Sequence, residues 1–191
     1  MSQIPYQPLE GRFVRLEPLA PEHRAGLEAV GAEDKIWQFT PRGGTIQQYL
    51  DAAYAAVKPD NHLPYVVRFL AKDKLIGMTR LFDISLQHRG AEIGHTWYHP
   101  DYWAGKTNPE CKFLLLRHGF EVCNLIRVQL KTDMRNKRSQ VAMAKMGAKH
   151  EGVLRNHMVL PDGRLRDSVY FSVLPDEWPA VKAGLQVRLD A

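Results

Sequence analysis

The order of elements in the middle of the chain is the feature that most restricts its fold. Residues 91–98 alternate as a strand does, and Asn108-Pro109 then begins a long helix, with asparagine at the N-cap and proline in the first turn. Residues 127–132 alternate again, and residues 137–146 predict a second helix that Gly147 ends. A strand, helix, strand, helix order predicts an α/β domain.

The segment before this unit predicts a strand and two helices. Residues 12–19 alternate as a strand, and Pro21 begins a short helix that ends near Gly31. A second helix begins at Thr45, because Gln48 lies three positions later and completes a capping box.

Two hairpins are also expected. Residues 64–71 and 75–82 predict an antiparallel pair, and residues 148–159 and 165–174 predict a terminal pair around Pro161-Asp162-Gly163. No linker or internal repeat separates these elements, so residues 1–191 are expected to form a single domain with a C-terminal hairpin at about 148–174.

Composition excludes several classes of protein. The 191 residues are 45% apolar and 25% charged, which is typical of a globular domain. No apolar run approaches the ~20 residues that span a bilayer, and no export signal begins the chain, so we expect a cytoplasmic protein without a membrane partner. The net charge of +5 is modest and no nucleic-acid-binding signature is present. Nucleic acid is therefore not expected as a partner.

The connection before the helix at Asn108 is a candidate phosphate site. Gly105 and Lys106 precede free N–H groups at a helix N-terminus, which bind anions. A P-loop would need another glycine five positions before Gly105, where this chain has Pro100. Two interpretations stay open: a pyrophosphate held without magnesium, and an ordinary strand-to-helix connection with a surface lysine.

A metal site is not expected. His95 and His99 are four residues apart and Asp101 is near, but this spacing suits a metal only on a helix, and the segment predicts a strand and a loop. The two cysteines, Cys111 and Cys123, lack the paired spacing of a structural zinc site and are expected to be reduced packing residues.

An ordered set of short motifs resembles the GNAT acetyltransferases, in particular the branch of ribosomal-protein N-terminal (alanine/serine) acetyltransferases. The set comprises Glu92-Ile93-Gly94, Trp97-Tyr98, Asn108-Pro109-Glu110, Leu114 to Glu121, Arg127-Val128, Asn136, Arg138-Ser139, Lys145 to Ala148, Asp162-Gly163 and Arg166-Asp167. The resemblance implies a splayed, mixed central sheet of about seven strands with flanking helices, in a monomer or homodimer.

The resemblance also implies acetyl-CoA as co-substrate, held by a core at about 90–147. Its pantetheine would pair with the strand at Ile93, Gly94, His95 and Thr96, and its pyrophosphate would meet Trp103, Ala104, Gly105, Lys106, Thr107 and Asn108. Lys106 stands where the family has a glycine, and its ammonium is expected to attract phosphate. Asn136, Arg138 and Ser139 would lie on the CoA side; alternatively, Asn136 only caps its helix.

Three residues are candidates for moving protons. Glu92 is the candidate base, acting through water, since alternation places it on one face with Gly94 and Thr96; alternatively, it is salt-bridged. Met143 occupies the position where related enzymes have a tyrosine acid, which leaves Ser139 and Tyr170 as candidates. Candidates for lining the acceptor pocket are Trp37, Phe39, Tyr65 and Arg68.

The expected activity is acetyl transfer to a primary amine by direct attack in a ternary complex. The acceptor would be a protein N-terminus or a small-molecule amine. The alternative is a non-catalytic domain that binds or senses acyl-CoA.

Overall fold

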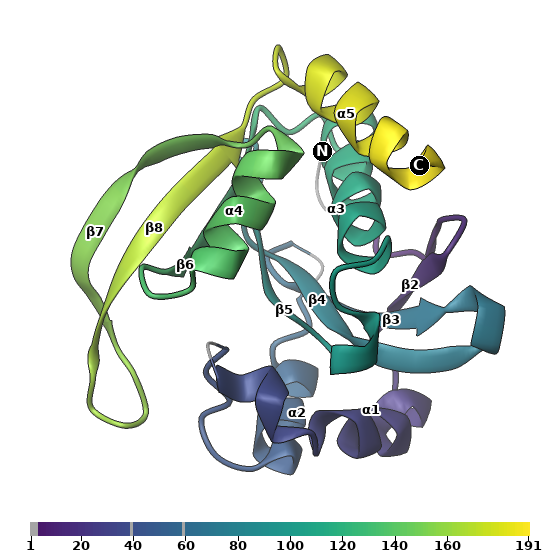
Figure 1. Ribbon diagram of the computed structural model, residues 1–191, viewed down its shortest axis with the longest axis vertical. Helices are drawn as coiled ribbons and strands as arrows, with labels where there is room; N and C mark the ends of the chain where they lie inside the picture. Colours follow the sequence, from purple (N-terminus) through teal and green to yellow (C-terminus); the bar gives the residue numbers. More distant parts are fainter. Residues whose placement is uncertain (1–3, 39, 59) are drawn as a thin grey trace.

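A computed structural model describes residues 4–38, 40–58 and 60–191, and its centre is one mixed sheet of eight strands (Figure 1). The strand order is β1-β2-β3-β4-β5-β6-β8-β7. The strands are β1 (Leu9–Glu10), β2 (Val14–Pro18), β3 (Leu63–Phe69), β4 (Lys74–Ser85), β5 (Gly90–Tyr98), β6 (Arg127–Asp133), β7 (Lys149–Val159) and β8 (Leu165–Val173). The α/β fold class is therefore confirmed, and the short β1 brings the expected seven or so strands to eight.

Five α-helices within the described residues cover this sheet. They are α1 (Arg24–Gly31), α2 (Ile46–Ala55), α3 (Thr107–Arg117), α4 (Lys137–Met146) and α5 (Trp178–Asp190). The capping box at α2 is confirmed, because Thr45 N–H donates to Gln48 Oε1 and Gln48 N–H donates to Thr45 Oγ1. Gly147 ends α4 with a φ of 95°, as its position predicts.

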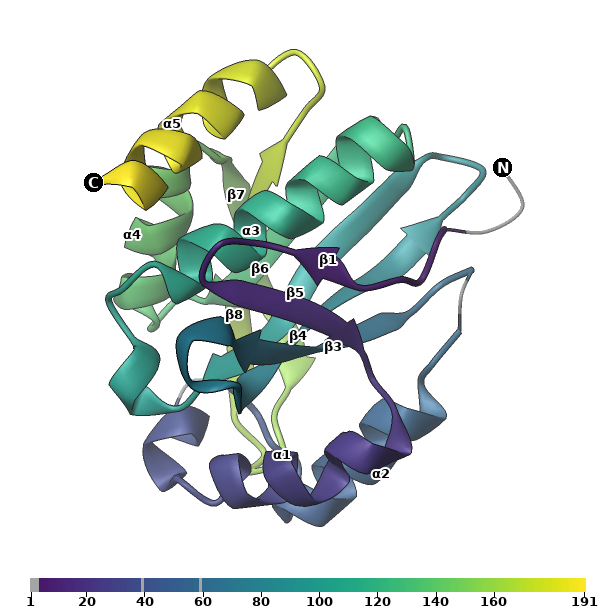
Figure 2. The ribbon, with the colours of Figure 1, turned by 90° about the vertical axis from the view of Figure 1, so that its right-hand side faces the viewer.

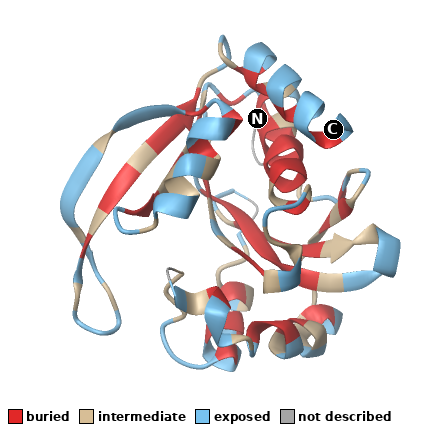
Figure 3. Ribbon diagram, viewed as in Figure 1, coloured by how far each residue is buried: buried red, intermediate tan, exposed pale blue. Residues whose placement is uncertain are grey.

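The helices lie on opposite faces of the sheet (Figures 1 and 2). Helices α3, α4 and α5 share one apolar core with alternate residues of the strands, among them Ile93 and Val128. Helices α1 and α2 form a second core with Val66, Met78 and Trp97, which come from β3, β4 and β5. Beyond β5 this second face carries polar side chains, and Figure 3 shows that β7 at its far edge is largely exposed.

The sheet splays apart between β5 and β6. These two strands form a parallel pair, but their register ends at Glu92 opposite Gln129. Strand β5 continues to Tyr98 against β4, and β6 continues to Asp133 against β8. Residues 93–98 and 130–133 therefore flank an opening, which places backbone groups of β5 along one of its walls.

A β-bulge lies in β5 at this opening. Thr79 of β4 stands opposite two residues, because the register shifts between the Met78–Trp97 and Arg80–Gly94 pairs. His95 has a φ of 48°, in the left-handed region that non-glycine residues rarely adopt. The bulge corrects the expectation that Glu92, Gly94 and Thr96 share a face: Glu92 contacts β6, whereas Thr96 contacts α3 on the opposite side.

Helix α3 begins slightly earlier than its sequence suggests. Thr107 is its first residue and Lys106 is the N-cap, so Asn108 lies inside the first turn. The sequence favoured Asn108 because asparagine is a common cap, and Pro109 fits anywhere in a first turn, where no N–H is needed. After Arg117 the helix widens into a π-helical turn, His118–Val122.

Candidate active site

The loop before α3 forms a row of unbonded backbone N–H groups. Among the described residues, the N–H groups of 104–108 donate to no acceptor, and Lys106 at the N-cap provides no side-chain bond. Ala104 has a φ of 59°, which turns the chain just before the helix. A Cβ added at Gly105 would meet nothing within 4 Å. We call residues 104–108 the cradle; its geometry suits a phosphate group.

The side chain of Lys106 is engaged elsewhere. Its ammonium donates to the carbonyl of Leu189 at 2.9 Å and lies 4.9 Å from the centroid of the Phe13 ring. A cation at the C-terminal end of α5 is favourable because that end of a helix carries partial negative charge. Lys106 thus offers the cradle its backbone N–H, while its ammonium, which was expected to attract phosphate, ties the end of α5 to the start of α3.

Helix α4 begins across the opening from the cradle. Asn136 is its N-cap, and Asn136 Oδ1 accepts from the N–H of Ser139 at 3.0 Å, as the capping interpretation predicts. The guanidinium of Arg138 lies 4.0 Å from the Trp103 ring, a cation–π contact that links α4 to the loop before the cradle. Trp103 and Arg138 are therefore in contact with each other. Ser139 lies on α4 as well, and its N–H donates to the Asn136 cap of that helix.

Glu92 lies on the opposite face, at the base of the opening. It is 1% exposed, and its Oε2 accepts from Lys131 Nζ at 2.9 Å and from Gln129 Nε2 at 3.0 Å. Burial raises the pKa of this carboxyl above 4.5, against the lowering effect of Lys131. Glu92 is therefore salt-bridged, as the alternative predicted, and it is also a carboxylate with raised proton affinity in an opening, which suits a general base.

Further polar side chains surround Glu92. Lys131 Nζ lies 5.8 Å from the Tyr170 ring, and the Tyr170 hydroxyl is 3.3 Å from His157 Nε2. Desolvation and, next, the charge of Arg80 lower the pKa of His95, whose side chain enters the same space. We call this group of polar side chains on the Glu92 side of the sheet the open face; its members are Arg80, Glu92, His95, Lys131, Arg166 and Tyr170. Two catalytic candidates, Glu92 and Tyr170, belong to it, whereas Ser139 does not.

A buried lysine on the α3 side escaped the sequence analysis. Lys112 Nζ donates to Thr96 Oγ1 at 2.9 Å, and Thr96 Oγ1 is 2.8 Å from Thr79 Oγ1. Lys112 is 7% exposed, and its burial lowers its pKa to about 8. It holds the bulge from the helix side. The apolar residues around it made this lysine inconspicuous, and only its place one turn after the cradle could have singled it out.

The candidates for an acceptor pocket separate in the structure. Trp37 packs on Tyr49 and Trp97 beneath the opening, but Tyr65 is fully buried against Tyr6 in the core on the α3 side. That burial removes Tyr65 from any pocket, and Phe39 lies outside the described residues.

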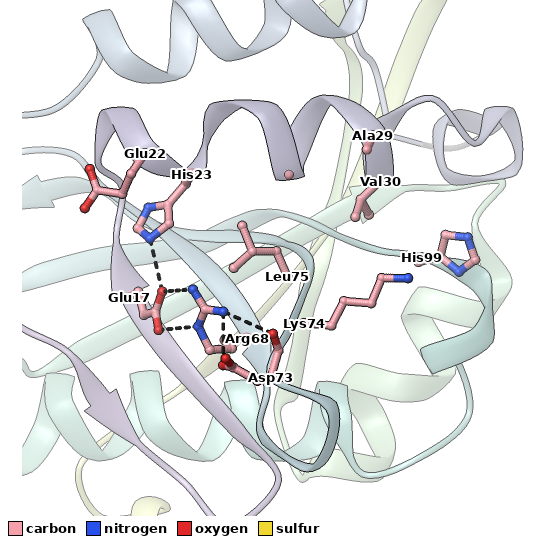
Figure 4. Close-up of a pocket in the computed structure, with 11 residues that line it drawn as sticks. Glu17, Glu22, His23, Ala29, Val30, Arg68, Asp73, Lys74, Leu75 and His99 are labelled. Atoms are coloured by element: carbon pink, nitrogen blue, oxygen red, sulfur yellow. Dashed lines mark hydrogen bonds and ion pairs between the residues drawn. The ribbon is translucent and has the colours of Figure 1, made fainter.

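Arg68 also lies away from the opening. Figure 4 shows it in a hollow between α1 and the β3–β4 turn, where Glu17 Oε1 accepts from Arg68 Nε at 2.7 Å. Asp73 also accepts from Arg68, and His23 lies 3.1 Å from Glu17. This hollow is a network of matched charges at a distance from the cradle, so Arg68 does not line the acceptor side.

The chain belongs to the GNAT acetyltransferase family. A family model described as "Acetyltransferase (GNAT) domain" matches residues 14–149, which include the opening, the cradle and the start of α4. The structure of a GCN5-related N-acetyltransferase from Brucella melitensis is 32% identical, with a TM-score of 0.87 over 99% of this chain and 89% of that one.

Two further relatives extend the comparison. Mycobacterium smegmatis RimJ, solved in complex with CoA-disulfide, is 20% identical, with a TM-score of 0.79 over 94% of this chain and 92% of that one, and it shares the fold. The uncharacterized N-acetyltransferase YoaA of Bacillus subtilis (strain 168) is 31% identical over 104 residues. That match covers 54% of this chain and 58% of YoaA.

The described residues lack two other kinds of feature. None of the helices in the described segments is both long and apolar enough to cross a membrane. Within residues 4–38, 40–58 and 60–191, no three histidine, cysteine or acidic side chains cluster as metal ligands would.

Proposed function

We propose that this chain transfers an acetyl group from acetyl-CoA to a primary amine by direct attack in a ternary complex, in the cytoplasm, as a monomer or homodimer. One observation carries the proposal: the opening between β5 and β6 has the unbonded N–H groups of the cradle on one side of the sheet and a buried carboxylate, Glu92, on the other. Family membership and the CoA-bound RimJ structure of the same fold support it.

The cradle would hold the pyrophosphate of CoA. Its N–H groups at 104–108 are unbonded within the described chain and lie at the positive end of α3, so they fit two adjacent phosphates. Arg138 and Trp103 would close over this end, with Asn136 and Ser139 shaping the start of α4. On β5, the unpaired edge at Ile93, Gly94, His95 and Thr96 would hydrogen-bond the pantetheine.

Glu92 would accept the proton that the amine loses. An amine attacks only when it is neutral, so a water held by the Glu92 carboxylate would take a proton from the incoming ammonium. The N–H groups at the bulge, around His95 and Thr96, would polarise the thioester carbonyl as negative charge develops on its oxygen. Lys112 would keep these groups in place by holding Thr96.

The leaving thiolate has two candidate proton donors, Tyr170 and Ser139. Tyr170 lies on the open face near Lys131, and Ser139 lies on the α4 side, so the two would approach the sulfur from opposite faces. Neither is indispensable, because a thiol with a pKa of about 8.5 leaves readily as the thiolate.

Acetyl transfer is tested by incubating the protein with radiolabelled acetyl-CoA and a panel of primary amines, both peptides and small molecules. The proposal expects label on at least one amine, with release of one CoA per acetyl group. Tight binding of acetyl-CoA without transfer to any amine would contradict it.

That contrary result would instead support a second candidate, a non-catalytic acyl-CoA-binding or sensing domain. Met143 on α4 favours this candidate, because it is 5% exposed and provides no hydroxyl at the position where related enzymes have a tyrosine. The ion pair between Glu92 and Lys131 also favours the non-catalytic candidate.

A further inference from the structure

Two arginines of the open face are buried without a carboxylate partner among the described residues. Arg80 on β4 is 5% exposed and Arg166 on β8 is 7% exposed, and the Nε of each lacks a hydrogen bond there. The other contacts of Arg80 are His62 Nε2 at 3.3 Å and the Tyr49 ring. No hydrogen bond or ion pair within the described chain involves the Arg166 guanidinium.

The carboxylates near Arg166 already have other partners. Glu92 accepts from Lys131, and Asp133 accepts from Arg164 at 2.6 Å and from the N–H of Arg135. Both carboxylates lie close enough to raise the pKa of Arg166, although its burial outweighs them and lowers it. Each carboxylate near Arg166 is therefore already paired with another cation, and the charge of Arg166 is left unmatched.

A buried, unmatched guanidinium is costly for a fold. Arginine cannot shed its proton in a protein, so it cannot relieve the cost of burial as a lysine can. The Nε–H of each of these arginines is shut off from water and therefore needs an acceptor, which the described residues do not provide. The hollow of Figure 4 shows the usual solution in this same molecule, because Arg68 there is held by Glu17 and Asp73. Arg80 and Arg166 lack such partners.

The unmatched charges converge on one place in the opening. The pKa of His95 is lowered first by desolvation and then by Arg80, His62, Lys131 and Arg166, which come from four different segments of the chain. Arg80, Lys131 and Arg166 carry positive charge there, whereas burial lowers the pKa of His62 to about 4 and leaves it neutral near pH 7. The His95 ring packs against Phe82 and His62, yet the residue remains accessible, so a ligand can approach it.

Asp83, whose charge reaches His62 and Glu92, is a carboxylate without an ion pair among the described residues, so it offsets one of the two unmatched arginines. The remaining excess charge is positive, which disfavours an acceptor whose only charge is its ammonium.

We propose, on the basis of the acetyl transfer proposed above, that the acceptor amine also carries a carboxylate or phosphate group, which Arg166 binds with help from Arg80. The planar guanidinium suits such an oxyanion because it donates two parallel hydrogen bonds. Holding the anion at Arg166 would place the amine on the same face as Glu92. The open face thus selects acceptors by a charge remote from the reacting nitrogen.

Matched acceptor pairs test this inference. Each pair shares one amine and differs in the anion: an amino acid and its amide, an amino sugar phosphate and the free amino sugar, and a short peptide with aspartate or asparagine at its second position. Initial rates at saturating acetyl-CoA give kcat/KM for wild type, Arg166→Met and the control Arg68→Met, whose arginine lies outside the open face.

In at least one pair, wild type and Arg68→Met should prefer the anionic member by about 10- to 100-fold, the range for hydrogen bonds to charged groups. The pair that shows the preference identifies the source of the anion. Arg166→Met should lose most of the preference. Its urea midpoint should equal or exceed that of wild type, because an apolar side chain replaces an unmatched buried charge.

Three outcomes would overturn the inference. Equal acetylation of both members in every pair by wild type would remove it and leave acetyl transfer intact. If Arg166→Met keeps the preference for the anionic member, Arg166 does not bind the anion. Acetylation of no member, with acetyl-CoA bound, would overturn both this inference and the proposed function.

Discussion

The two sides of the opening between β5 and β6 recognise their ligands by different means. On the α3 side, the cradle offers backbone N–H groups of residues 104–108. On the open face, side chains such as Glu92, Lys131 and Arg166 provide the chemistry. A backbone site depends on conformation more than on residue type, so it tolerates Lys106 where the resemblance expects glycine. A side-chain site fails when one residue changes.

The largest expected effect tests the side-chain half of this comparison. Glu92→Gln should lower kcat by 10²-fold or more, because general base catalysis contributes about 10²- to 10⁴-fold. Because the pKa of Glu92 is raised, the acidic limb of the wild-type kcat/KM profile should lie above pH 4.5. Stopped-assay rates over pH measure both; acetyl-CoA affinity, measured by calorimetry, should stay the same. Full activity in Glu92→Gln would assign the base elsewhere.

The second prediction concerns Lys112, the buried charge on the α3 side. Its pKa is about 8 in the fold and about 10.4 in the unfolded chain, so the unfolded chain binds more protons between these values. Stability should therefore rise with pH over this window. The gain in wild type relative to Lys112→Met should be on the order of 1 to 3 kcal/mol, measured by urea unfolding at pH 7.5 and 10. A flat difference would mean that Lys112 is solvated.

The third prediction tests the backbone half of the comparison. Gly105→Val should weaken acetyl-CoA binding about tenfold, roughly 1.4 kcal/mol, because its side chain would enter the open space above the cradle. Gly184→Ala is the matched control: a Cβ there also meets nothing within 4 Å, but the residue lies on α5. Titration calorimetry compares the two variants. Equal affinities would place the phosphates away from the cradle.

The smallest expected effect concerns the contact between Arg138 at the start of α4 and Trp103 just before the cradle. Arg138→Ala removes the cation–π contact with Trp103, which is worth about 0.5 to 1 kcal/mol at an exposed site, so acetyl-CoA affinity should fall about two- to fivefold. Arg138→Lys should retain part of it. The decrease should be smaller for dephospho-CoA if Arg138 also meets the 3′-phosphate, and an unchanged affinity would make the contact incidental.

Local signals predicted most of the fold. The Thr45–Gln48 capping box, Gly147 and the Pro161-Asp162-Gly163 turn each act over a few residues, and each lies where the sequence indicates. Helix α5 was missed although it had a signal: Trp178, Val181, Leu185 and Leu189 recur at helical spacing and are buried. This stretch follows the terminal hairpin, the last element predicted from the sequence.

The site was less predictable because it depends on contacts between distant segments. The β5 bulge reverses the face of Thr96, and a bulge leaves little trace in an alternating strand. Lys131 and Arg166 became site candidates only because the fold places them near Glu92. Glu92 and Lys131 are 39 residues apart in the chain. The position of Lys106 just before a helix predicted that its ammonium would attract phosphate. In the structure the ammonium instead donates to Leu189 of α5, a helix that was not predicted.

Calorimetric titration with acetyl-CoA, repeated with Gly105→Val and Glu92→Gln, separates cofactor binding at the cradle from proton transfer at the open face. We expect one site per chain, weakened by added salt and by Gly105→Val but not by Glu92→Gln, because phosphate recognition belongs to the cradle and proton transfer to the open face. Absence of binding to wild type, or weakening by Glu92→Gln alone, would contradict this expectation.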